Sequence, residues 1–274
     1  MTIELIALDL DGTTLNSKGH LSIRNKVALE TAAERGVNVV IATGRCYDAL
    51  PDEILKVKGI QYAITSNGAQ IRDLISGKAI YNNFIDSNAV EEAAKVLRVY
   101  DYMTEVFIAG SAFIEKSIYE GVRDREIVFR HRDYVVNTRQ PVEKVLDFML
   151  SNKNKIENIN IFFPTMEDKN KMHPILQTIK NVTLTTSLDS NWEIGGSTTS
   201  KASALDELSN ILKVPKSEIM ACGDSPNDGD MLREAGIAVA VGNAKPVIKE
   251  IATFISGTND EDGVAMAVEK FVLK

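Results

Sequence analysis

The chain has few of the residues that build disulfide frameworks or zinc sites. Its 274 residues include only two cysteines, Cys46 and Cys222, which stand far apart and outside any CxxC pattern. They predict neither a disulfide framework nor a zinc centre. The three histidines, His20, His131 and His173, are scattered singly and show no metal-ligand spacing. We therefore expect reduced thiols, and histidines that lie at the surface or are partly buried.

Long apolar runs and blocks of basic residues are also missing. No apolar run approaches the length of a membrane span, and the first residues begin a strand instead of a basic segment with an apolar core. The 31 lysines and arginines are outnumbered by 38 aspartates and glutamates, which gives a formal net charge of −7. The absence of a Lys/Arg cluster argues against a nucleic-acid partner. We expect a cytoplasmic protein with no membrane attachment.

The rest of the composition is that of an ordinary globular protein, with 44% hydrophobic and 25% charged residues. Residues 21–35 predict a helix that has Ser22 as its N-cap and Gly36 after its end. Residues 37–42 form a continuous apolar run, which is typical of a parallel strand buried on both faces. With the apolar strand at 3–8 they predict a right-handed βαβ unit. We also expect a helix at 48–57, a strand at 62–65 and a hairpin from 70 to 84 around a Ser-Gly turn.

The pattern changes between residues 85 and 189. Helices there alternate with strands that carry alternating polar residues, which predicts an antiparallel sheet with one solvated face. From residue 193 the apolar strands return, so we predict an α/β domain (1–84 and 190–274) interrupted by an α+β domain (85–189). The expected helices of the insertion are 88–100, 142–151, 166–179 and a solvated one at 120–132, and its strands are 104–109, 158–163 and 183–187. After it we expect strands at 218–222 and 237–241, and helices at 201–212, 230–235 and after Pro246.

Two aspartates end the first apolar strand. Alternate residues of an extended chain point the same way, so Asp9 and Asp11 are expected to face one pocket. Two carboxylates held that close repel each other unless a cation or a shared proton compensates. The pair therefore indicates a metal site or an acid/base pair. On these residues alone, a strand followed by a common Asp-Gly turn is an equal alternative.

Two further strands end in polar motifs of the same kind. Thr43 follows the strand at 37–42, and Asp224, Asn227 and Asp228 follow the strand at 218–222. In open parallel sheets, ligands bind outside the carboxyl ends of the strands. Three such motifs at equivalent strand ends favour a real site over three independent turns.

The residue types indicate phosphoryl chemistry. The carboxylates of Asp9, Asp11 and Asp224 are hard oxygen ligands of the kind that Mg²⁺ takes. The side chain and amide of Thr43, together with Lys201, could bind phosphoryl oxygens. One carboxylate can attack as a nucleophile and form an aspartyl-phosphate, and a second can protonate the leaving oxygen and later activate water.

Several of these residues also have simpler interpretations. Lys201 could be an ordinary lysine at a helix start, and Asn243 in VGN is expected to be a turn residue. The stretch GGSTTSK faintly resembles a P-loop, but Ser200 stands where that loop requires glycine and Ala202 where it requires Ser or Thr, so we reject a nucleotide cradle. Arg45 either faces the substrate or ties the inserted domain to the core.

Four motifs occur in order along the chain: DLDGTTL at 9–15, ATGR at 42–45, SKASAL at 200–205 and GDSPND at 223–228. With them the chain resembles the haloacid dehalogenase (HAD) superfamily, specifically the Cof-type phosphatases, which include sugar phosphatases. The resemblance covers the whole chain. It implies a Rossmann-like parallel-sheet core with an inserted C2-type α+β cap for substrate specificity. Ala202 departs from the pattern, because the family more often has glycine after this lysine.

The resemblance also implies a role for each motif residue. Asp9 would be the nucleophile and a Mg²⁺ ligand. Asp11 would be the general acid/base and give its backbone carbonyl to the metal, and Asp224 would be the third protein ligand. Thr43, Gly44, Lys201 and Asn227 would hold the phosphate, Arg45 and Asn67 would lie at the substrate pocket, and Asp228 would support the metal ligands from behind.

We therefore predict a Mg²⁺-dependent phosphatase that hydrolyses small phosphorylated metabolites, with sugar phosphates as the first candidates, through an aspartyl-phosphate. One alternative is a phosphomutase of the same superfamily, whose close relatives carry a different second motif from this TGR. Another is a non-catalytic protein that binds phospho-metabolites, although an inert site has no need of Asp9, Asp11, Lys201 and Asp224 together. The expected partner is the small substrate, with no nucleic acid or membrane; nothing in the sequence predicts the oligomeric state.

Overall fold

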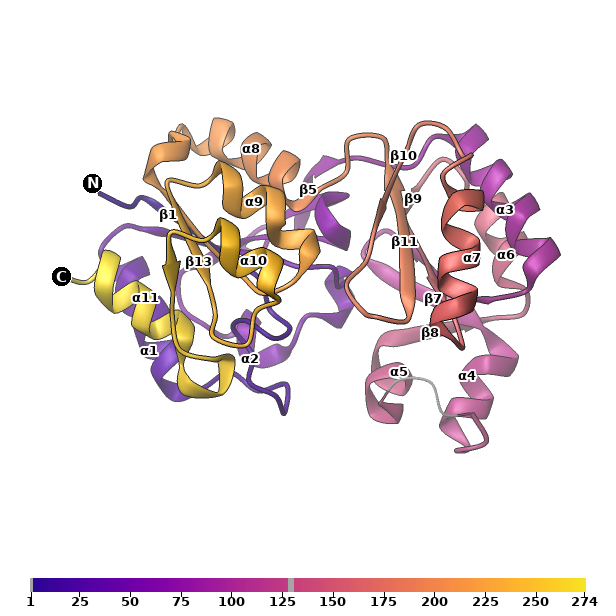
Figure 1. Cartoon of the computed structure of the whole chain (residues 1–274), viewed down its shortest axis with the longest axis horizontal. Coiled ribbons are helices and arrows are strands. Elements are labelled where there is room, and N and C mark those ends of the chain that lie inside the picture. The colour runs from indigo at the N-terminus through magenta and orange to yellow at the C-terminus, as the bar shows by residue number, and fades with distance from the viewer. Residues whose placement is uncertain (1, 128–130) are drawn as a thin grey trace. The chain divides into compact units, whose positions relative to one another are not determined.

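The computed structural model describes residues 2–127 and 131–274, which form two compact units (Figure 1). The larger unit takes its residues from Met1–Arg45, Leu50–Tyr81 and Ser200–Lys274. The smaller unit is made of Cys46–Ala49 and Asn82–Thr199. Among the described residues, we find no helix with the length and apolar character needed to cross a bilayer.

The larger unit is built on an eight-stranded sheet with the order β14-β13-β12-β1-β2-β3-β4-β5. Six strands run parallel: β1 (Leu5–Leu8), β2 (Asn38–Ala42), β3 (Ile60–Thr65), β12 (Ile219–Gly223), β13 (Ile237–Ala240) and β14 (Phe254–Ile255). Strand β4 (Gln70–Asp73) is antiparallel to β3, and β5 (Lys78–Asn82) pairs with β4 at the edge. Every residue of β1 is buried, as its continuous apolar run predicts.

Helices pack on this sheet in two groups (Figure 1). The apolar residues of α8 (Lys201–Leu212), α9 (Gly229–Glu234) and α10 (Pro246–Ile251) share one core with the sheet. The helices α1 (Ile23–Glu34) and α11 (Gly263–Phe271) pack against each other, joined by a 2.9 Å hydrogen bond from the Ala265 amide to Asn25 Oδ1. Ser22 caps α1 as predicted, because its side chain accepts a hydrogen bond from the Asn25 amide.

The predicted helix at 48–57 is wrong as a continuous element. The chain instead makes a 3₁₀ turn (Tyr47–Ala49) and then the short helix α2 (Asp52–Leu55). Pro51 separates them, since its ring has no backbone N–H to continue a helix from the preceding turn.

The smaller unit holds a six-stranded sheet with the order β10-β11-β9-β6-β7-β8. Its pairs are antiparallel except for β7 with β8, which are parallel. The helices α3 (Ser87–Tyr100), α6 (Val145–Ser151) and α7 (Met166–Leu176) share a core with this sheet (Figure 1). The strands are β6 (Met103–Ile108), β7 (Ser111–Glu115), β8 (Arg139–Val142), β9 (Ile156–Phe162), β10 (Val182–Thr185) and β11 (Asn191–Gly196).

The chain returns to the larger unit later than predicted. Strand β11 pairs with β9 and β10 in the smaller sheet, so the larger unit resumes at Ser200 and not at residue 190. The alternation of side chains shows that a segment is extended, but it does not show which sheet the segment joins.

The solvated face predicted for the inserted sheet is also wrong. The alternating polar residues of β6, β9 and β11 are buried, Glu105 and Asn191 completely. They bond to one another: Asn191 Nδ2 donates to Asn160 Oδ1 at 2.9 Å and to Glu193 Oε1 at 3.0 Å. Polar side chains that hydrogen-bond to each other can be buried. Alternation of polar and apolar residues therefore does not by itself identify a solvent-exposed face.

The helix predicted at 120–132 falls partly on residues 128–130, which lie outside the described residues. In the described part, α4 (Lys116–Arg123) ends at Arg123 and residues 124–127 are not helical, and α5 (Arg132–Thr138) begins beyond the residues that are not described. Arg125 takes a left-handed φ of 67°, and the amides of Glu126 and Ile127 both donate to the Gly121 carbonyl. Helices commonly end at a residue with left-handed φ, after which the following amides donate to carbonyls of the last helical turn.

Candidate active site

The carboxyl ends of the parallel strands position the predicted residues. Asp9 follows β1, and its amide donates to the Cys222 carbonyl of β12 at 3.1 Å. Thr43 follows β2, and its amide donates to the Ile64 carbonyl of β3 at 2.9 Å. Asp224 follows β12 directly. The adjacent strands therefore bring these side chains to one edge of the sheet, as the motif positions predict.

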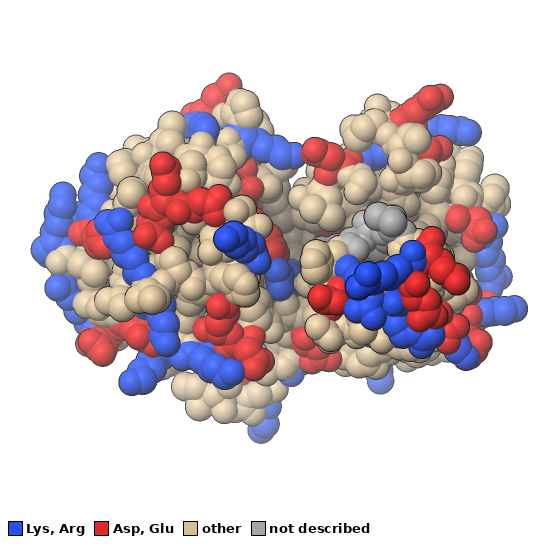
Figure 2. All heavy atoms as spheres, turned by 90° about the horizontal axis from the view of Figure 1, so that it is seen from below, with Lys and Arg blue, Asp and Glu red and all other residues tan. Residues whose placement is uncertain are grey.

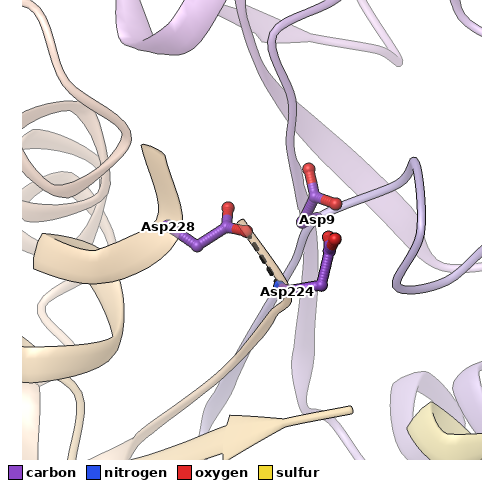
Figure 3. A group of neighbouring side chains, drawn as sticks. All are labelled: Asp9, Asp224 and Asp228. Carbon is purple, nitrogen blue, oxygen red and sulfur yellow. Dashed lines mark hydrogen bonds between the residues drawn. The ribbon is translucent and has the colours of Figure 1, made fainter. Parts of the chain in front are cut away.

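Three carboxylates gather at this edge. Asp9, Asp224 and Asp228 each offer an oxygen, and these oxygens lie within 4.8 Å of one another. Figure 3 shows the side chains of Asp9 and Asp224 directed toward the same space, with Asp228 on the neighbouring turn. Asp9 and Asp228 are buried and Asp224 is partly buried.

Lys201 supplies the positive charge. As the first residue of α8, it places Nζ 2.6 Å from Asp9 Oδ1 and 2.7 Å from Asp228 Oδ1. Burial opposes its charge, but Asp228 and Asp9 more than offset this and raise the pKa of the Lys201 ammonium. It is therefore a fixed cation and not only a lysine at a helix start.

One buried ammonium does not balance three carboxylates. Burial raises the pKa of Asp9 well above its ordinary value, Lys201 opposes this, and Asp228 and Asp224 add to it. Burial, with the charge of Asp228, also raises the pKa of Asp224. An excess of buried hard oxygen donors is the condition that a divalent cation such as Mg²⁺ relieves.

The carboxylates differ in how far the protein already satisfies them. Asp228 Oδ2 accepts from the amides of Asp224 and Ser225, each at 3.0 Å, and its Oδ1 accepts from Lys201. Asp9 Oδ2 accepts no hydrogen bond from any described residue, and each oxygen of Asp224 accepts one from a hydroxyl. Asp9 and Asp224 thus retain the capacity to hold a metal, whereas Asp228 orients its neighbours.

Asp11 is engaged by Arg45. The guanidinium places Nε 2.8 Å from Asp11 Oδ2 and Nη2 2.6 Å from Asp11 Oδ1. The Asp11 side chain is 58% exposed and the Arg45 side chain 15%. The sequence did not predict this pairing of Arg45 with Asp11. The two alternatives for Arg45 were that it faces the substrate or that it ties the inserted domain to the core.

Thr43, Gly44, Asn67 and Asn227 form the other side of the site. Thr43 Oγ1 accepts from the Arg45 amide at 3.1 Å, and the Thr43 carbonyl accepts from the Asn67 amide at 3.0 Å. Asn67 Oδ1 accepts from Asn227 Nδ2 at 3.0 Å, and a Cβ at Gly44 would lie 3.1 Å from that oxygen. Asn227 Oδ1 is buried and has no partner among the described residues. Such unpartnered buried acceptors are rare, and this one is left to accept a hydrogen bond from a ligand or a water molecule.

The loop after β1 is fixed by residues for which the motifs implied no role. Gly12 has φ +80°, and a Cβ on it would lie 2.8 Å from Asp224 Oδ2, so only glycine fits. Thr13 Oγ1 donates to Asp224 Oδ1 at 2.9 Å. Asn243 Nδ2 donates to the Gly12 carbonyl at 2.7 Å, while its Oδ1 accepts from the Asn259 amide. The signal for Asn243 was its place just after an apolar strand, which also fits an ordinary turn.

Comparison with known proteins agrees with this site. The chain matches the haloacid dehalogenase-like hydrolases over residues 6–268, and it therefore belongs to that family. It is 34% identical to phosphatase YwpJ of Bacillus subtilis over 96% of this chain and 98% of the relative. It is 32% identical to the 5-amino-6-(5-phospho-D-ribitylamino)uracil phosphatase YcsE of the same organism, over 99% of this chain and 96% of the relative.

A solved structure supports the same assignment. BT1666 of Bacteroides thetaiotaomicron, a phosphatase of the HAD superfamily, matches with a TM-score of 0.81 and 27% identity over 98% of this chain and 95% of that chain. The resemblance carried by the four motifs is confirmed, and so is the α/β core with an inserted α+β unit. The protein is an HAD-type phosphatase.

Proposed function

We propose that this phosphatase hydrolyses small phosphorylated metabolites, with sugar phosphates and phosphorylated polyols first, through an aspartyl-phosphate and with Mg²⁺. The observation that carries the proposal is the buried Asp9, which Lys201 holds by one oxygen at 2.6 Å while the other accepts no hydrogen bond from a described residue. A carboxylate held in this way presents a lone pair for attack.

In the first half-reaction, Asp9 Oδ2 attacks phosphorus and the bond from phosphorus to the ester oxygen breaks. Asp11 gives a proton to the departing alkoxide. In the second half-reaction, Asp11 takes a proton from water, the oxygen of that water attacks phosphorus, and the bond to Asp9 breaks. Inorganic phosphate leaves, and both carboxyl groups return to their starting states.

The surrounding residues stabilise the charge that develops on the phosphoryl group. Lys201 and the hydroxyl of Thr43, whose oxygen accepts from the Arg45 amide while its proton can be donated, would offset negative charge on the phosphoryl oxygens. Asp9, Asp224 and the backbone carbonyl of Asp11 would hold Mg²⁺, which would supply further positive charge. Asp228 keeps Lys201 and the loop of Asp224 in place through three hydrogen bonds to its side chain, from Lys201 Nζ and from the amides of Asp224 and Ser225.

The substrate class rests on the relatives and on the inserted unit. YcsE is named for a substrate that carries a phosphorylated ribityl chain, and we transfer that class, not that compound, to this chain. We assign the smaller unit as the cap that sets specificity. Lysine and arginine side chains are mixed with aspartate and glutamate on the face in Figure 2, which suits a small-molecule partner better than a polyanion.

The proposal is tested by phosphate release from p-nitrophenyl phosphate and from a panel of sugar, nucleotide and cofactor phosphates. We expect turnover that chelation abolishes and added Mg²⁺ restores, with the highest kcat/KM among sugar and polyol phosphates. Transfer of the phosphoryl group to a second hydroxyl without net release would identify a mutase. Saturable binding of the panel without turnover would identify a binding protein.

A further inference from the structure

The carboxylate assigned to proton transfer is held at both of its oxygens by one side chain. Arg45 donates through Nε to Asp11 Oδ2 at 2.8 Å and through Nη2 to Asp11 Oδ1 at 2.6 Å. This is the bidentate arrangement in which the guanidinium fork matches a carboxylate. It fixes the side chain of Asp11 although more than half of that side chain is exposed.

This arrangement differs from the one that proton transfer requires. A general acid has to carry a proton on one oxygen and present it to the leaving group. In the bidentate pair the N–H donors of Arg45 engage both oxygens of Asp11, so neither oxygen is turned toward a leaving group. Asp11 therefore has to leave Arg45, at least in part, before it can protonate an alkoxide.

The backbone of Arg45 allows its side chain to change partners. Its amide donates to Thr43 Oγ1 at 3.1 Å, and its carbonyl accepts from the Ser66 amide at 2.8 Å. The start of the side chain is thus anchored two residues from Thr43, which we assign to phosphate binding. A phosphoryl group offers the same pair of oxygens as a carboxylate and more negative charge, so it competes for the same fork.

We propose that Arg45 exchanges partners when the substrate binds. It holds Asp11 while the phosphate pocket is empty, and it turns to the phosphoryl oxygens when the pocket is filled, which releases Asp11 for proton transfer. Arg45 is then a positioning residue for Asp11 as well as a phosphate ligand. The inference rests on the proposed function, because it takes Asp11 as the acid and the phosphate ester as the competitor.

The exchange is tested by a double-mutant cycle on phosphate binding, which needs no turnover. The affinity for inorganic phosphate in the presence of Mg²⁺ is measured by calorimetry for the natural protein, Asp11→Asn, Arg45→Gln and the double variant. We expect Asp11→Asn to tighten binding by about fivefold or more when Arg45 is present, since phosphate no longer has to displace a carboxylate. In the Arg45→Gln background, the same change is expected to have less than about half that effect.

Measuring Asp11→Asn in the Arg45→Gln background distinguishes the exchange of partners by Arg45 from the simple removal of a negative charge. Loss of one negative charge favours any anion, so an equal gain from Asp11→Asn in both backgrounds would overturn the exchange. Arg45→Lys is the second variant: it keeps the charge but not the fork, and we expect it to weaken the coupling between the two positions. Thermal unfolding checks that each variant is folded. Failure of the proposed function would appear separately, as absence of phosphate release by the natural protein from every ester of the panel.

Discussion

Each unit of the molecule buries a cation against carboxylates, and the two arrangements differ in balance. In the smaller unit, Arg139 and Glu105 make a one-to-one bidentate pair, with both nitrogen–oxygen distances at 2.8 Å. The guanidinium also lies 4.6 Å from the centre of the Tyr134 ring. In the larger unit, Lys201 contacts two carboxylates, and Asp224 lies beside them.

The difference separates a structural pair from a reactive one. Burial opposes the charge of Arg139, but Glu105 more than offsets this and raises the pKa of the guanidinium, so the pair is matched. At Lys201, one ammonium faces three carboxylates, so negative charge is in excess. Burial and the neighbouring carboxylates raise the pKa of Asp9. A matched pair can persist for packing alone, whereas an unmatched cluster is costly unless it serves a ligand or a reaction.

The largest expected effect is the loss of turnover in Asp9→Asn. The change removes the attacking carboxylate but keeps its size, so kcat should fall by about 10³-fold or more. Circular dichroism is expected to stay unchanged, since Asp228 still holds Lys201. Asp52→Asn is the matched control, because Asp52 is an exposed aspartate paired only across one helical turn with Lys56. Residual activity of Asp9→Asn near that of the control would contradict the assignment of the nucleophile.

The matched pair is expected to affect stability instead of chemistry. Arg139→Met leaves Glu105 buried without its cation, which should cost about 3–5 kcal/mol of unfolding free energy. Replacing both partners, as Arg139→Met with Glu105→Leu, should recover most of that loss. Urea unfolding followed by tryptophan fluorescence reports the unfolding free energy of the smaller unit, because the single tryptophan, Trp192, lies on β11 of that unit.

Two outcomes would break the distinction between the clusters. If the double variant were as unstable as Arg139→Met alone, the pair would not be the source of the loss. If Arg139→Met abolished Mg²⁺ binding while remaining folded, the smaller unit's pair would belong to the chemistry after all.

The sequence predicted the reactive cluster better than the matched pair, and for a physical reason. Asp9, Thr43 and Asp224 stand directly after apolar parallel strands, so strand geometry alone brings them together. Arg139 and Glu105 meet only because β8 and β6 both pair with β7. Such pairing between strands distant in sequence leaves no local pattern.

Other features of the site were hidden for the same reason. The contact between Arg45 and Asp11, and the anchoring of Gly12 by Asn243, each join residues from separate strand ends. Motif spacing placed these residues near the site but did not show which atoms meet. The sequence did not predict that the chain re-enters the larger unit only at Ser200, because the alternation of side chains along β11 does not show which strand it pairs with.

A third prediction concerns metal binding by the unmatched cluster. Mg²⁺ that binds only the folded protein should stabilise it by about 2.7 kcal/mol at a concentration one hundred times its Kd. We expect the thermal unfolding midpoint to rise with Mg²⁺ in the natural protein and in Arg139→Met. The rise should be much smaller in Asp224→Asn, which loses one charged oxygen ligand. An equal rise in Asp224→Asn and the natural protein would place the metal elsewhere.

The smallest expected effect uses one thiol in each unit as a reporter. Burial raises the pKa of Cys46 in the smaller unit and of Cys222 in the larger unit to about 12. Both thiols should therefore stay unreactive toward a thiol reagent at about pH 8 in the folded protein and react only on opening.

The raised pKa values also set the direction of a pH effect. The folded chain keeps protons on both thiols that the unfolded chain loses above its ordinary pKa of 9.0, so stability should fall as pH rises from 9.0 toward about 12. Cys46→Ala and Cys222→Ala, labelled separately, show which unit opens first. Arg139→Met should speed the labelling of Cys46, which lies among the groups around Arg139, more than that of Cys222. Equal acceleration at both thiols would mean that the two units open together, and the matched pair would then stabilise the whole chain instead of its own unit.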